Sequence, residues 1–192
     1  MTTTITGSGG VSQVQDGSIG TADFAANAIT AAKLPTGSVL QVISYYTAAQ
    51  TAQTLSSTDA VINSMSKVVT PLGANSKFLV VLRWGGEVTG TQDTTFNIQM
   101  DGTRVNSGGG QGYYLGFPCV SYSGSNANST PETINFSTLV STSSSIGTDI
   151  TFRVVGNTNT STTMWSNRCF GSAPTGGTEG TTSELIITEI AG

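Results

Sequence analysis

Residues 96–105 read FNIQMDGTRV, and this stretch decides the fold class. Apolar and polar side chains alternate from Phe96 to Met100, which is the pattern of a strand with one buried face. Asp101-Gly102 comes next, a pair typical of a tight two-residue turn, and Arg104-Val105 can return as a short strand. The stretch therefore predicts an antiparallel hairpin.

Other segments carry the same strand signals at intervals of roughly ten residues. The predicted strands are 39–46, 67–70, 77–84, 94–100, 113–122, 133–140, 149–155 and 184–190. Residues 47–58 are expected to form a Thr- and Ala-rich connection, and turns are expected at 73–76, 85–86 and 156–157. No convincing helix pattern separates these segments, so we expect an all-β fold, an antiparallel β-sandwich of the jelly-roll kind.

The composition excludes several classes of protein. Charged residues make up 9% of the chain, against roughly 25% in an ordinary soluble domain. The net charge is −4 and the seven Lys and Arg residues are not clustered, so we expect no nucleic-acid partner. The longest apolar run, 78–82, is too short for membrane insertion. The first residues, Met1-Thr2-Thr3-Thr4, lack the features of a secretory signal, so we expect synthesis in a cytoplasm without export.

A different rhythm occupies residues 14–39, which read VQDGSIGTADFAANAITAAKLPTGSV. The large apolar residues follow one another at intervals of five, and they are Val14, Ile19, Phe24, Ile29, Leu34 and Val39. Neither a helix nor a half-buried strand has this period. Residues 18–24 and 28–34 also match as a weak ten-residue repeat, but two copies are too few for a self-standing solenoid.

Three parallel chains around one axis would bury these rows against one another, with a gain of about 1.5–3 kcal/mol for each large side chain. We therefore predict a homotrimer. We expect residues 1–37 to form an extended arm with single helical turns that serves docking and trimerisation, and residues 38–192 to form the β-sandwich domain. The alternative is that Ala25 to Leu34 form an ordinary short helix at the edge of the domain.

Catalytic chemistry finds little support in the sequence. The chain has no histidine, which excludes Ser–His–Asp and Cys–His arrangements and leaves a zinc site short of ligands. The eleven Asp and Glu residues are scattered, and the best turn formers among them are Asp59, Asp93, Asp101 and Asp149. Gly108-Gly109-Gly110 lacks the residues of a phosphate-binding loop. We expect a protein that is not an enzyme and binds no metal or cofactor.

Two smaller groups of residues carry weaker predictions. Cys119 and Cys169 are either two small buried side chains or, in an oxidising medium, a disulfide. Gln111, Tyr113 and Tyr114 flank a Gly-rich loop and are candidates for contact with a receptor, such as a host-surface glycan. The competing interpretation of these aromatic residues is that they belong to a core or an interface.

Residues 28–42, AITAAKLPTGSVLQV, resemble the entry into the terminal domain of small tail-fibre-like proteins of tailed bacteriophages, many from aquatic hosts. Residues 69–80 look like a strand pair of that family, and residues 183–192 are similar to its C-terminal strand. The resemblance implies a structural protein on the virion surface, a trimeric knob of β-sandwich protomers on an N-terminal arm, without catalytic residues.

Three functions remain as expectations. The first is a homotrimeric fibre or receptor-binding appendage for host attachment, anchored by its arm to a tail or baseplate protein. The alternative is a capsid decoration protein, a cement or head-spike trimer on the major capsid protein, which fits the lack of a shaft of many repeats. A carbohydrate-processing enzyme is the third, and the lack of histidine and of paired carboxylates counts against it.

Overall fold

The computed structural model describes residue 26 and residues 28–88, 94–105, 117–118, 131–143, 145–169 and 180–192. Among these residues the one helical segment is a 3-10 turn, and every strand pair is antiparallel, so the prediction of an all-β fold is confirmed. The elements are η2 (Ala31–Lys33), β1 (Val39–Thr47), β2 (Thr51–Leu55), β3 (Ala60–Val69), β4 (Lys77–Val88), β5 (Thr94–Met100), β6 (Thr103–Arg104), β7 (Phe117–Pro118), β8 (Glu132–Ser141), β9 (Ile150–Thr158), β10 (Thr162–Ser166) and β11 (Ser183–Ile190).

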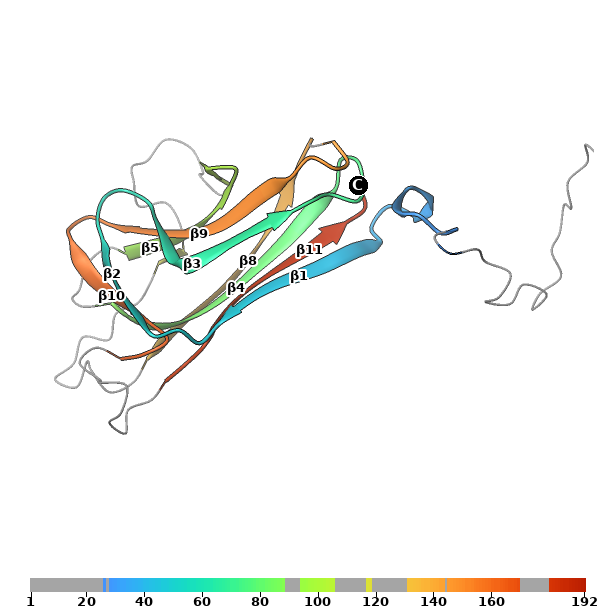
Figure 1. Ribbon diagram of the computed structural model, residues 1–192. Helices are drawn as coiled ribbons and strands as arrows, with labels where there is room; N and C mark the ends of the chain where they lie inside the picture. Colours follow the sequence, from blue (N-terminus) through green and yellow to red (C-terminus); the bar gives the residue numbers. More distant parts are fainter. Residues whose placement is uncertain are drawn as a thin grey trace, which may run out of the picture.

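The strands form two sheets (Figure 1). One has six strands in the order β1-β11-β4-β10-β2, and β8 pairs with β4 as well. The other has five strands in the order β3-β9-β5-β6, and β7 pairs with β5. The last strand of the chain, β11, therefore lies between the first, β1, and the central strand β4, which places the C-terminus beside the start of β1.

Side chains from both sheets meet in one apolar core. Phe78 of β4 packs against Phe152 of β9, with ring centroids 5.3 Å apart. Trp84 of β4 meets Phe96 of β5 edge to face at 5.0 Å, and its indole nitrogen donates to Ser166 Oγ at 3.0 Å. All four rings are fully buried, so these aromatic pairs fix the two sheets against one another.

The hairpin predicted at residues 96–105 is present. Gln99 pairs with Arg104 and Met100 with Thr103, so Asp101 and Gly102 are the two turn residues between β5 and β6. Both have positive φ, 49° and 81°, which is the backbone of the type I′ turn that matches the twist of paired strands. The prediction from this one stretch is therefore confirmed.

Other strand predictions were wrong in extent. The expected connection 47–58 contains β2, and β10 was not predicted. Two residue pairs expected as turns, Gly85-Gly86 and Gly156-Asn157, lie inside β4 and β9. Space explains both glycine positions: a Cβ on Gly86 would overlap the Trp165 backbone oxygen, and one on Gly156 would lie 2.6 Å from Ile62 Cδ1.

Candidate assembly site at the root of the arm

Of the predicted arm, the structure describes residue 26 and residues 28–37. We call residues 28–37 the arm root, and its large apolar side chains are exposed. Ile29 is 58% exposed, Leu34 is 37% exposed, and Val39, where β1 begins, is 57% exposed. These are three of the six residues of the five-residue rhythm. Val14, Ile19 and Phe24 lie outside the described residues, so the prediction for the full row stays a prediction.

The backbone of the arm root alternates between extended residues and one tight turn. Thr30 (φ −103°, ψ 162°) and Leu34 (φ −85°, ψ 144°) are extended, and η2 between them is a single 3-10 turn closed by the Leu34 amide donating to the Ala31 carbonyl at 3.1 Å. Residues 28–34 thus hold no α-helix, and the alternative interpretation of this stretch as an ordinary short helix is wrong for them.

The C-terminus anchors the arm root to the sheets. The Gly37 amide donates to the Ala191 carbonyl at 2.9 Å, and the Ala191 amide donates to the Ser38 carbonyl at 2.8 Å. Thr36 Oγ1 adds a bond to the Gly192 carbonyl at 3.1 Å. Gly37 has φ +90°, a left-handed conformation that glycine adopts without strain. The arm therefore starts from a fixed point.

A buried carboxylate reinforces this anchor. Glu189 of β11 is 0% exposed, and its oxygens accept hydrogen bonds from Ser76 Oγ at 2.6 Å and from Gln41 Nε2 at 2.6 Å. The amides of Leu72 and Gly73 donate to it at 2.9 and 3.0 Å. Burial raises the pKa of this carboxyl, but the hydrogen bonds outweigh it, and the pKa lies below the usual value. Glu189 thus ties β1 and residues 72–76 to the C-terminal strand.

A pocket of about 210 Å³ opens between the arm root and these anchoring residues. Its lining carries no charged side chain and consists of Ala31, Ala32, Leu34, Leu40, Gly73, Ala74, Ile146, Ala191 and Gly192. Because the side chains that line it are small or apolar, such a pocket can receive an apolar side chain.

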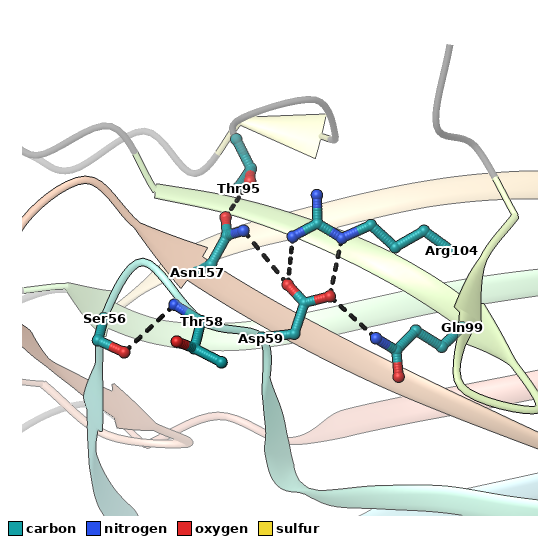
Figure 2. A network of polar contacts seen from close by, with 7 residues as sticks. All are labelled: Ser56, Thr58, Asp59, Thr95, Gln99, Arg104 and Asn157. Atoms are coloured by element: carbon teal, nitrogen blue, oxygen red, sulfur yellow. Dashed lines mark hydrogen bonds and ion pairs between the residues drawn. The ribbon is translucent and has the colours of Figure 1, made fainter. Parts of the chain in front are cut away.

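A second polar cluster lies on the five-stranded sheet (Figure 2). Asp59, which precedes β3, accepts hydrogen bonds from both Nε and Nη2 of Arg104, the first at 2.8 Å. It also accepts from Gln99 at 2.9 Å and from Asn157 at 3.2 Å. The hydrogen bond to Asp59 raises the pKa of Arg104 against the lowering effect of burial. Because four donors converge on this carboxylate, it holds the β2–β3 connection in place.

The structure gives different roles to the predicted turn formers. Asp59 is an ion-pair partner, and Asp101 does form a turn, where its Oδ1 also accepts from the Thr151 amide at 2.8 Å. Asp149 accepts from Thr70 Oγ1 at 2.5 Å. Asp93 lies outside the described residues. Within the described part of the chain, no three His, Cys, Asp or Glu side chains group as metal ligands.

The remaining predicted sites receive no test. Gln111, Tyr113, Tyr114 and Cys119 lie outside the described residues. Cys169 is fully buried, which agrees with the interpretation as a small buried side chain but leaves its pairing with Cys119 a prediction. Over the stretches that the structure describes, no helix has the length and apolarity needed to cross a bilayer.

Sequence analysis missed the Glu189 anchor, although a signal was present. Leu185, Ile187 and Glu189 occupy alternate positions of one strand, so the carboxylate shares the buried face of its apolar neighbours. A carboxylate at such a position requires hydrogen-bond partners. The sequence does not show which donors it finds.

Comparison with known proteins identifies no relative: no family model matches the chain, and no curated protein matches it.

Proposed function

We propose that this chain is a non-enzymatic structural protein of a tailed-phage virion, a homotrimeric fibre or receptor-binding appendage that its N-terminal arm attaches to the particle. In this proposal the two sheets form a β-sandwich knob of the jelly-roll kind. The virion assignment rests on the resemblance of residues 28–42, 69–80 and 183–192 to phage tail-fibre-like proteins.

The proposal of a homotrimer rests on one observation. Ile29, Leu34 and Val39 leave 58%, 37% and 57% of their surface exposed although the chain around them is anchored to the C-terminus. A regular row of exposed large side chains on an anchored segment favours burial by another subunit. Burying each one contributes about 1.5–3 kcal/mol, a gain that three parallel copies can share.

A pair of substitutions tests the trimer. Ile29→Asp together with Leu34→Asp places charges in the predicted contact, so the purified variant should fall from three chains to one. Val68→Asp is the matched control, because Val68 is 53% exposed on the outer side of the other sheet. Light scattering coupled to size-exclusion chromatography measures both masses. An unchanged mass for the arm variant removes the support for assembly through the arm.

Locating the protein on the particle tests the virion assignment. Gold-labelled antibody should mark the tail, at a few trimers per particle. Label spread over the head at tens to hundreds of copies would instead favour the alternative, a capsid decoration protein bound to the major capsid protein. Particles without label would contradict both.

A further inference from the structure

The outer face of the six-stranded sheet is unusually apolar. The strands β1, β11, β4 and β8 lie side by side (Figure 1). Their register aligns outward-facing residues into rows across the strands. The two inner rows contain no charged residue, and they are Val42–Thr188–Leu79–Leu139 and Ser44–Ile186–Val81–Ser137. We call these eight residues the outer patch.

Alternation along the strands shows that this patch is a second apolar face. In β4, Phe78, Val80 and Leu82 point into the core and are fully buried, while Leu79 and Val81 between them are partly exposed. An antiparallel sheet with one solvent-exposed face normally has polar residues at these outward positions. Strands that are apolar on both faces are typical of sheets covered on both sides.

Charges stand at the two ends of the outer patch. Lys77 occupies the next row at one end, beside Ile190 and Ser141. Glu184 and Arg83 pair across strands in the next row at the other end, with 4.0 Å between Glu184 Oε2 and Arg83 Nη2. An apolar centre with a charged rim is the usual anatomy of a subunit interface.

In the single chain, large side chains at the edges of this surface are exposed to solvent. Val42 on β1 is 61% exposed, Leu139 on β8 is 58% exposed, and Tyr46, at the Glu184 end of β1, is 60% exposed. A patch that exposes several large apolar side chains usually marks a binding surface.

We propose that a second copy of this chain covers the outer patch, so that the six-stranded sheets of the trimer face one another. This inference rests on the proposed homotrimer and names the surface through which its knobs meet. The arm is continuous with the surface: Val39, the last residue of the five-residue rhythm, pairs with Ile190 at the Lys77 end of the patch. A contact that runs along the arms therefore continues directly onto this face.

The sheet face alone is smaller than a stable interface, so the proposed contact includes the arm as well. Four strands and four rows, counting the charged rows, cover about 19 by 27 Å, or roughly 500 Å². A stable interface buries about 800 Å² on each partner. The sheet face supplies the larger part of that area, and the exposed side chains of the arm supply more. The occupant must itself be apolar, because the patch offers no polar side chains except Ser and Thr.

Substitution of the two most exposed residues of the patch tests the inference. Val42→Asp with Leu139→Asp should raise the dissociation constant of the trimer by more than about tenfold, because each charge would be buried in the contact. Val68→Asp is the control, since it changes another exposed valine on an edge strand of the other sheet, and it should leave the constant unchanged. Sedimentation velocity across a dilution series measures all three proteins.

The milder pair Val42→Thr with Leu139→Thr guards against misfolding, because threonine keeps a high strand propensity. It should weaken the trimer in the same direction, with an unchanged circular dichroism spectrum. An unchanged dissociation constant in either folded variant overturns the inference but leaves the homotrimer standing. A wild-type protein that is monomeric at every concentration overturns the homotrimer and this inference together.

Discussion

Glu189 shows how a single charged side chain can stabilise a largely apolar strand. Its carboxylate is buried and accepts hydrogen bonds from Ser76, Gln41, Leu72 and Gly73. Glu189→Gln removes the charge and turns one acceptor into a donor that faces other donors. We expect the free energy of unfolding at pH 7 to fall by about 2 kcal/mol, measured by urea denaturation. Glu184→Gln, on the outer face of the same strand, should change it by less than about 0.5 kcal/mol.

The same residue gives the stability a defined pH dependence. Because the pKa of Glu189 is lower in the folded than in the unfolded protein, ionised Glu189 stabilises the fold fully above the unfolded-state pKa, about 4.3. This contribution disappears as the pH falls through the lower, folded-state pKa. The difference in stability between the wild type and Glu189→Gln should therefore shrink in strong acid. A difference that stays constant from neutral pH to strong acid would show that the charge has no such role.

Asp59 and Arg104 form the corresponding pair on the five-stranded sheet. The side chains of both are less than one-fifth exposed, so Asp59→Asn leaves a largely buried guanidinium without its counter-charge. We expect a loss of about 2–3 kcal/mol in the free energy of unfolding. Combination with Arg104→Gln should cost clearly less than the sum of the single losses, because the two residues act as a unit. Additive losses in this double-mutant cycle would argue against the pair.

At the scale of elements, residue 86 must be glycine because of close packing, which the neighbouring sequence does not reveal. It lies in β4 where a Cβ would overlap the Trp165 backbone oxygen and approach the Trp84 ring. Gly86→Ala should therefore destabilise the protein by more than about 3 kcal/mol or prevent folding. Gly180→Ala is the matched control, because its Cβ would make only ordinary contacts, the nearest at 3.5 Å. Thermal unfolding and the yield of soluble protein measure both variants.

The strands that sequence analysis predicted well are those whose own residues specify one buried face. β5 was predicted with its full bounds, and the Asp101-Gly102 turn with its partner strand, because alternation and turn chemistry are local. β2 was missed because its Thr, Ala and Gln residues give little strand signal by themselves. β10 was missed because it has only five residues, and it is held as a strand by pairing with both β2 and β4. The glycines inside β4 and β9 were read as turns because close approach of another strand cannot be seen locally.

The candidate site was predictable to a similar degree. The five-residue rhythm singled out Ile29, Leu34 and Val39 as side chains without a partner in their own chain, and the structure leaves them exposed. The outer patch was beyond such reasoning, because it depends on the register that aligns β1, β11, β4 and β8. The donors of Glu189 likewise lie in two segments far from it in the sequence, Gln41 on β1 and residues 72–76.

At the scale of the whole molecule, two exposed apolar surfaces follow one another along the chain. The arm root carries one and the outer patch carries the other, and they join at Val39. A single subunit exposes both to water, whereas three subunits around one axis can bury them together. The proposal of a virion appendage depends on this assembly.

The mass of the purified full-length chain in solution is the most direct test. Sedimentation equilibrium at micromolar concentration should give three times the 19.6 kDa of one chain, with dissociation only on strong dilution. A mass of 19.6 kDa that persists as the concentration is raised would contradict the proposed assembly.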